Sequence, residues 1–120
     1  MAMHQSKIRN QAGHPVKIHN PAGHPVAQLY EALGAIEISE KRGMLTVWYP
    51  LGTSISYREE VRPHVGSAEP IKDSDGRTAC FYYHADNLLE IKKGRCYTHI
   101  QFPPGSKLEF DTDDTGQALS

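Results

Sequence analysis

The chain has 120 residues, with 13 Lys and Arg against 14 Asp and Glu, a formal net charge of −1 and 38% hydrophobic residues. This length suits one domain that can bury a core without disulfides, and the even charge argues against the basic patch that binds nucleic acid or an anionic membrane surface. No apolar run approaches the ~20 residues that span a bilayer, and the N-terminal residues lack the apolar stretch of a secretory signal.

The N-terminus carries one decapeptide twice: residues 7–16 read KIRNQAGHPV and residues 17–26 read KIHNPAGHPV. The second copy contains the turn sequence Asn20-Pro21-Ala22-Gly23. Two copies are too few for a solenoid, which needs about three repeats to bury a core. We therefore interpret the repeat as a tandem duplication that lengthens the N-terminus, as an arm or an added strand.

A short helix is expected over about residues 25–33. The apolar residues of this stretch recur at the spacing of one helix face; they are Val26, Leu29, Tyr30 and Leu33. Pro25 suits the first helical position, and Gly34 suits the left-handed residue that follows a helix.

After Gly34 the apolar residues alternate with polar ones, which is the period of a strand. Strand character is found at 36–39, 44–49, 53–58, 77–84, both halves of 88–102 and 107–111, where Leu108 and Phe110 are expected to face inward. The separating turns are Lys41-Arg42-Gly43, Pro50-Leu51-Gly52, Asp73-Ser74-Asp75-Gly76 and Pro103-Pro104-Gly105. Between 59 and 73, Pro63 and Pro70 each remove a ladder N–H, so this stretch is expected to be a loop or an edge strand.

The run 88–102 is interpreted as a hairpin closed by Lys93-Gly94, so that Ile91 faces Cys96 and Leu89 faces Thr98. One face then carries Leu89, Ile91, Cys96 and Ile100, and the other carries Leu88, Glu90, Tyr97 and His99. The pattern leaves open which of the two faces is buried.

These patterns predict a mainly β fold, an antiparallel meander of six to seven short strands preceded by one short helix. The strands could form a small barrel, a sandwich or a curled sheet. The expected organisation is an N-terminal arm over 1–24 with the tandem duplication, a single β-rich domain over 25–111, and a disordered acidic tail over 112–120.

Several kinds of functional site lack their sequence signature. There is no GxGxxG, GxxxxGK[ST], HExxH, GxSxG or EF-hand loop, which argues against nucleotide-phosphate cradles, zincin metalloproteases and α/β-hydrolases. His14, His19 and His24 recur every five residues, a spacing that does not bring neighbouring imidazoles to one metal ion on a strand or a helix. No metal site and no cofactor are expected.

Acid–base chemistry has its candidates in the predicted sheet. A carboxylate beside a histidine holds the tautomer of the ring and raises its basicity, and Glu90 lies on the strand that pairs with that of His99. His84 shares a strand face with Cys80 and Tyr82, which makes His99, Glu90 and His84 the catalytic candidates. The sequence favours a plainer interpretation, a solvated hairpin face formed by Tyr97, His99, Glu90 and Gln101. His64 lies in the irregular stretch VRPHVG with no visible partner.

The two cysteines, Cys80 and Cys96, are too few for a disulfide scaffold and have no C-x-x-C spacing. Each has apolar neighbours, so both are expected to be small buried side chains. Reduced thiols and the missing signal sequence together favour a cytoplasmic location.

Aromatic residues cluster on three predicted strands: Trp48, Tyr49, Tyr57, Phe81, Tyr82 and Tyr83. Consecutive strand residues point to opposite faces, so Tyr82 and Tyr83 cannot both lie in one core. One face should therefore present rings toward the helix, a ligand or a partner. The candidate binding residues are Trp48, Tyr57, Tyr82 and Tyr97.

Three functions are compatible with these features. The leading hypothesis is a non-enzymatic binding module that engages a protein partner or a small ligand, but no nucleic acid or membrane, through an aromatic sheet face or a barrel mouth. The second is a small acid–base enzyme with a His/Glu/Tyr pocket, which requires His99 and Glu90 in a concave site. The third is a homo-oligomeric structural or assembly subunit that pairs its edge strands.

Overall fold

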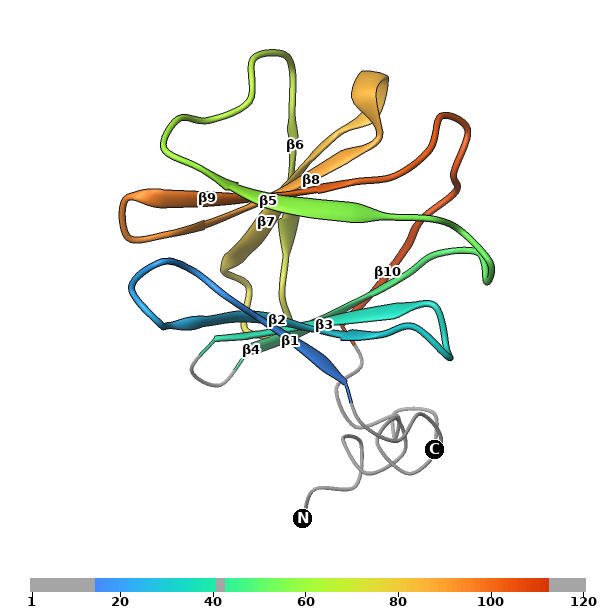
Figure 1. Ribbon diagram of the computed structural model, residues 1–120, viewed down its shortest axis with the longest axis horizontal. Coiled ribbons are helices and arrows are strands. Elements are labelled where there is room, and N and C mark those ends of the chain that lie inside the picture. The colour runs from blue at the N-terminus through green and yellow to red at the C-terminus, as the bar shows by residue number, and fades with distance from the viewer. Residues whose placement is uncertain (1–14, 41–42, 113–120) are drawn as a thin grey trace.

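The computed structural model describes residues 15–40 and 43–112, which form two stacked β-sheets (Figure 1). The strands are β1 (Val16–His19), β2 (Pro25–Tyr30), β3 (Ala35–Glu40), β4 (Gly43–Trp48), β5 (Ser56–Glu60), β6 (Glu69–Lys72), β7 (Thr78–Tyr83), β8 (Leu88–Lys93), β9 (Cys96–Gln101) and β10 (Glu109–Asp111). A 3₁₀ turn, η1 (His84–Asp86), follows β7. Most of the first decapeptide copy with His14, the turn residues Lys41 and Arg42, and residues 113–120 of the predicted acidic tail lie outside the described residues.

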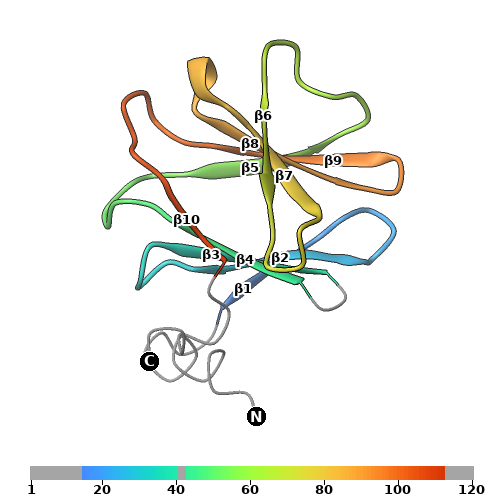
Figure 2. The ribbon, with the colours of Figure 1, turned by 180° about the vertical axis from the view of Figure 1, so that it is seen from behind.

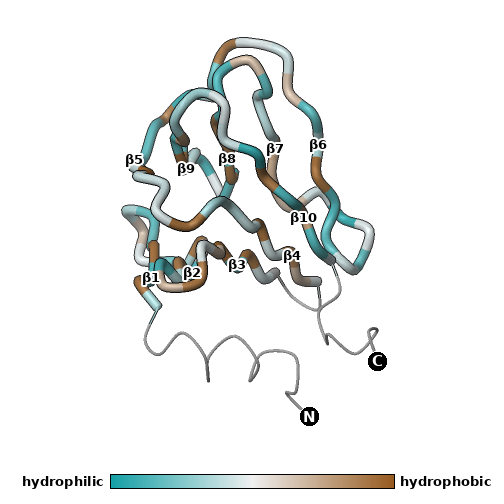
Figure 3. The backbone as a smooth tube through the Cα atoms, turned by 90° about the vertical axis from the view of Figure 1, so that its right-hand side faces the viewer, coloured by the Kyte–Doolittle hydropathy of each residue, from teal (hydrophilic) through white to brown (hydrophobic). Residues whose placement is uncertain are grey.

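Each sheet contains five antiparallel strands. Sheet A has the order β1-β2-β3-β4-β10, and sheet B has the order β5-β9-β8-β7-β6. Figures 2 and 3 show the two layers from behind and from the side. The predicted mainly β, antiparallel fold is confirmed, and of the three architectures considered the chain adopts the sandwich rather than a closed barrel.

The hydrophobic core lies between the sheets. Its fully buried side chains include Ile36, Leu45 and Val47 from sheet A and Leu89 and Ile100 from sheet B. Burial of an aliphatic side chain of this size contributes about 1.5–3 kcal/mol to folding. The last strand, β10, returns to β4 with Phe110 opposite Val47, and Leu108 and Phe110 pack against the core as predicted.

The predicted helix over residues 25–33 is wrong, because Pro25–Tyr30 is β2, an internal strand of sheet A. This strand is buried on both faces: Leu29 packs in the core between the sheets, whereas Tyr30 packs on the opposite face with Ala35, Leu33 and Trp48. A strand buried on both faces loses the apolar–polar alternation that identifies strands. Because both faces of β2 carry apolar residues, their spacing along the chain matched that of a helix face.

The second decapeptide copy contributes a hairpin to sheet A. Asn20 organises its turn, since Asn20 Oδ1 accepts hydrogen bonds from the N–H groups of Ala22 and His24, both at 3.0 Å. The N–H of Gly23 donates to the carbonyl oxygen of Asn20 at 2.8 Å, which confirms the predicted turn. Since β1 pairs with β2, the sandwich includes residues from Val16 onward, within the segment that the sequence assigned to an arm.

Gly34 has the left-handed conformation that the sequence predicted, with φ of 67°, but it closes the β2–β3 hairpin rather than a helix. A Cβ at this position would lie 2.5 Å from the carbonyl oxygen of Tyr49. Gly34→Ala is therefore expected to lower the free energy of unfolding by about 2–3 kcal/mol, of which about 1–2 kcal/mol reflects the left-handed backbone.

Urea unfolding monitored by circular dichroism measures this loss, and Gly52→Ala is the matched control. Gly52 also has a left-handed φ, 83°, but nothing lies within 4 Å of a Cβ built there. Its loss should be limited to the backbone cost of about 1–2 kcal/mol. Equal losses in the two variants would contradict the close approach of Gly34 to Tyr49.

The seven predicted strands correspond to β3, β4, β5, β7, β8, β9 and β10. β2 was predicted as a helix, whereas β1 and β6 lie where the sequence allowed an added strand or an arm and an edge strand or a loop, respectively. β6 contains Pro70 and lies at the edge of sheet B, where a missing ladder N–H is tolerated. No helix long and apolar enough to cross a membrane occurs in residues 15–40 or 43–112.

The β8–β9 hairpin differs from its predicted register by two residues. Ile91 lies opposite Thr98, and Lys93 lies opposite Cys96, so Gly94 and Arg95 form the turn. Gly94 has φ of 64°, which fits the first central position of a type II′ turn, where glycine is required. A shift of two residues keeps every side chain on its predicted face.

Candidate functional site

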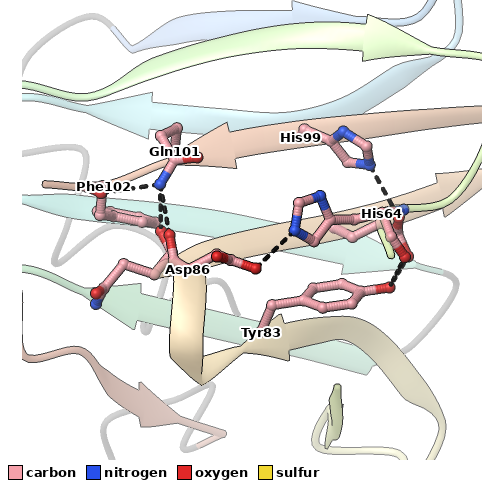
Figure 4. Close-up of polar contacts among 8 residues, drawn as sticks. His64, Tyr83, Asp86, His99, Gln101 and Phe102 are labelled. Atoms are coloured by element: carbon pink, nitrogen blue, oxygen red, sulfur yellow. Dashed lines mark hydrogen bonds and ion pairs between the residues drawn. The ribbon is translucent and has the colours of Figure 1, made fainter. Parts of the chain in front are cut away.

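The outer face of sheet B, which points away from sheet A, carries buried polar side chains beneath the loop 61–68. In the strand register Glu90 lies opposite His99, and both residues are only 3% exposed. The loop 61–68 joins β5 to β6 and brings His64 onto this face (Figure 4). We call the connected residues Glu90, His99, Tyr83, His64 and Asp86 the Glu90 cluster.

Glu90 is the centre of this cluster. Its Oε2 accepts a hydrogen bond from the backbone N–H of His64 at 2.6 Å and lies 2.8 Å from His99 Nε2. The Tyr83 hydroxyl lies 3.1 Å from Glu90 Oε1 and 3.0 Å from the carbonyl oxygen of His64, and it can donate to either. The carboxylate thus binds the loop directly through the N–H of His64 and indirectly through Tyr83.

The Tyr83 phenol is held in its protonated form. Burial, the hydrogen bond to Glu90 and the negative charge of Glu90 raise the pKa of Tyr83 to about 12. A protonated hydroxyl between two acceptor oxygens is a donor that both can use. The local electrostatics therefore preserve the hydrogen bond that connects sheet B to the loop.

His99 contributes only one ring nitrogen to the cluster. Nε2 faces Glu90, whereas Nδ1 is buried and makes no hydrogen bond to any described residue. A neutral ring with its proton on Nε2 can donate to Glu90 and leaves Nδ1 as an acceptor rather than as an unpaired N–H. We assign this tautomer to His99.

His64 connects the buried part of the cluster to solvent. Its Nε2 lies 2.8 Å from Asp86 Oδ2, and its ring packs edge-on against Tyr83 with 4.7 Å between centroids. The ring centroid of His99 lies 5.9 Å away. The side chain of His64 is 27% exposed and that of Asp86 is 49% exposed, so this pair lies at the surface end of the cluster.

A groove of about 450 Å³ lies between the loop 61–68 and η1. It is lined by Gly66, Ser67, Ala68, Glu69, His84, Ala85 and Asp86. His84 Nε2 lies 2.6 Å from Glu69 Oε1, and the ring of His84 packs against that of Tyr82 with 4.5 Å between centroids. The His84–Glu69 pair therefore lines this groove, together with Asp86, whose carboxylate also contacts His64.

Whether these residues can react with a bound molecule depends on how far they are buried. Glu90 and His99 are each 3% exposed and do not line the groove, so a molecule bound there would not reach them in this conformation. His84 and Asp86 line the groove and could exchange protons with a ligand in it. In residues 15–40 and 43–112, no three His, Cys, Asp or Glu side chains are grouped so as to hold a metal ion.

The structure brings the catalytic candidates His99 and Glu90 together and places His84 elsewhere, at the groove. The expectation of a solvated hairpin face is wrong for Glu90 and His99, because both are buried under the loop 61–68. It fits Tyr97 and Gln101 better, since both are partly exposed. Both faces of the β8–β9 hairpin are therefore covered, one by sheet A and the other by the loop.

The four aromatic candidates do not share a surface. Tyr82 is buried in the core between the sheets, and Trp48 packs with Tyr30 and Ala35 on the outer face of sheet A. Tyr57 is 44% exposed on the edge strand β5. Tyr97 is partly buried on β9, opposite Glu60 and Lys92.

Sequence reasoning missed His64, Tyr83 and Asp86 as members of the cluster. His64 lies 22 residues from Asp86 and 26 residues from Glu90 along the chain, and no short-range pattern joins residues so far apart. The sequence offered one partial signal: Leu88, which the structure buries fully, shares the face of Glu90. A single apolar residue on a strand face does not by itself show that the face is covered, since isolated apolar side chains are common on protein surfaces.

The two cysteines lie in different surroundings. Cys80 is 1% exposed in the core, as expected, and burial raises the pKa of its thiol to about 12. Cys96 is half-buried at the end of the β8–β9 hairpin.

Comparison of the chain with models of protein families, with curated proteins and with solved structures found no match.

Proposed function

We propose that the chain is a non-enzymatic binding module that recognises a protein partner through the loop 61–68. The observation that carries this proposal is the way Glu90 holds the loop. A carboxylate that is 3% exposed bonds the N–H of His64, and Tyr83 bonds its carbonyl oxygen. Burying a charge in a protein is costly, and here the buried carboxylate fixes the backbone of a surface loop.

The fixed loop presents apolar side chains to solvent. Val61 is 79% exposed and Val65 is 88% exposed, and they flank His64, which anchors the loop. Arg62 and Pro63 are also exposed. Rigid loops on a β-scaffold commonly carry binding residues. Arginine is enriched in protein interfaces, and the two exposed valines beside it add apolar area to such a contact.

The anchoring also bears on affinity. A loop that must be ordered on binding loses conformational entropy, which subtracts from the free energy of association. Because hydrogen bonds to Glu90 and from Tyr83 order the backbone of His64 beforehand, the flanking valines can contact a partner with little further ordering. The proposed binding surface is therefore the loop 61–68, whereas the sequence had led us to expect an aromatic sheet face or a barrel mouth.

The test is chemical cross-linking of the chain to cell proteins, compared among three forms. The double variant Val61→Asp/Val65→Asp should lose a cross-linked partner that the natural chain captures, because a charge at a buried contact costs several kcal/mol. Leu51→Asp changes a side chain that is 68% exposed on a different loop and should keep the partner. A partner retained by the double variant, or lost equally with Leu51→Asp, would refute the proposal.

General acid–base catalysis in the groove is a second candidate, supported by the His84–Glu69 pair and by Asp86, which line it. It uses His84, one of the three catalytic candidates of the sequence, and neither His99 nor Glu90. Hydrolysis of 4-nitrophenyl acetate that falls with His84→Gln, but not with His24→Gln on the β1–β2 turn, would favour it.

Light scattering of the same samples tests homo-oligomerisation through the edge strands, since a mass that rises with concentration would favour an assembly subunit.

A further inference from the structure

The outer face of sheet A, which points away from sheet B, is buried. We define this face by Tyr30, Ala35, Glu37, Thr46 and Trp48. The first four are each at most 5% exposed, and Trp48 is partly buried. In a two-layer sandwich, side chains that point away from the opposing sheet are exposed to solvent unless something else covers them.

The described residues do not provide such a cover. Sheet B packs on the other side of sheet A, and Figures 1 and 3 show no third layer among the described segments. The apolar cluster on this face is Tyr30 and Ala35 with Leu33 and Trp48, and of these only Leu33 lies outside the strands. A single leucine from the β2–β3 loop is too small to bury a face of this extent.

We propose that residues 1–14 of this chain dock on the outer face of sheet A. They lead into β1, the edge strand of the same sheet. Fourteen residues can extend roughly 45 Å, whereas five strands are only about 20 Å across, so the segment can reach every strand of the face. The first copy of the decapeptide then serves as a cover for the sheet to which the second copy contributes a hairpin.

Charge distinguishes this segment from the other end of the chain. Residues 1–14 contain Lys7 and Arg9 and no acidic residue, whereas residues 113–120 contain Asp113 and Asp114 and no basic residue. The face to be covered includes the carboxylate of Glu37, which is 2% exposed. A buried carboxylate favours a cationic neighbour over an anionic one, so the N-terminal segment fits this face and the C-terminal residues do not.

Trp48 is the only tryptophan of the chain and lies on this face, so its fluorescence reports on the cover. The full chain is compared with a chain lacking residues 1–14. Removal should raise the acrylamide quenching constant of Trp48 several-fold and shift its emission to longer wavelength. A peptide of residues 1–14 added in excess should reverse both changes.

A chain lacking residues 113–120 is the matched control and should leave Trp48 unchanged. If the truncated chain does not fold, the full-length variant Lys7→Glu/Arg9→Glu gives the same readout, and its quenching constant should also rise. Unchanged quenching after removal of residues 1–14, or in the charge variant, would overturn the proposal. So would a change caused by removing residues 113–120, or protection of Trp48 that depends on protein concentration, which indicates a second copy as the cover.

Discussion

Glu90→Ala is expected to lower the free energy of unfolding by about 3–5 kcal/mol, because it removes the carboxylate of a buried hydrogen-bonded cluster and leaves its partners buried without it. The Nε2–H of His99 and the N–H of His64 both lose their acceptor, and the Tyr83 hydroxyl keeps only the carbonyl oxygen of His64. The methyl group of alanine replaces none of these contacts.

Urea unfolding at neutral pH gives the size of the loss, and Glu109→Ala on β10 is the control. Glu109 is exposed, so its replacement should change the free energy of unfolding by at most about 0.5 kcal/mol. Glu90→Gln keeps the shape of the side chain and one acceptor oxygen, and its loss should be smaller, about 1–3 kcal/mol. A loss below about 1 kcal/mol for Glu90→Ala would show that Glu90 does not hold the cluster together.

The same variants separate a local effect from a global one. In the natural chain the amide proton of His64 donates to a buried carboxylate and should exchange slowly with deuterium. In Glu90→Ala it should exchange as fast as the exposed loop amides, even under conditions where the β8–β9 hairpin remains protected. This result would connect the buried charge to the order of the loop 61–68, on which the proposed binding function depends.

Short-range patterns predicted most strands of the fold because turns and alternation are local properties. The turn at Asp73 is an example: its Oδ1 accepts the N–H groups of Asp75 and Arg77 at 2.8 and 3.0 Å, within four residues of chain. β2 was missed because burial on both faces is decided by what packs against the strand. The sequence of Pro25–Tyr30 does not by itself indicate which segments pack against its two faces.

The candidate site was predicted only where strand pairing is local. Glu90 and His99 belong to one hairpin, and even a register two residues in error left them on one face. Alternation also separated Tyr82 from Tyr83, and the structure places Tyr82 in the core and Tyr83 in the Glu90 cluster. What the sequence did not show is the cover: a loop of irregular sequence makes that face a buried one.

Alkaline pH is expected to destabilise the fold through Cys80. Burial raises the pKa of this thiol from its ordinary value of 9.0 to about 12, so the folded state holds the proton more tightly than the unfolded state does. Stability from this group is fully present below pH 9 and is lost as the pH rises toward 12. Between about pH 8 and pH 10.5 the thiol should account for a loss of about 2 kcal/mol.

Tyr83 acts in the same direction, since its pKa is raised from 10.0 to about 12. Its contribution to the loss is about 0.4 kcal/mol at pH 10 and rises to about 1 kcal/mol at pH 10.5. Urea unfolding of the natural chain at the two pH values should therefore show a decrease of at least about 3 kcal/mol, since burial also raises the pKa of Tyr49 and Tyr82.

Replacing each cysteine in turn isolates the contribution of the thiol. Cys80→Ala should recover about 2 kcal/mol of the alkaline decrease, because no buried thiol remains to ionise when the chain unfolds. Cys96→Ala removes a half-buried thiol at the hairpin end and should leave the decrease as it is in the natural chain. If both variants lose stability as steeply as the natural chain, burial of Cys80 does not control the alkaline transition, and ionisation of the buried tyrosines must account for it.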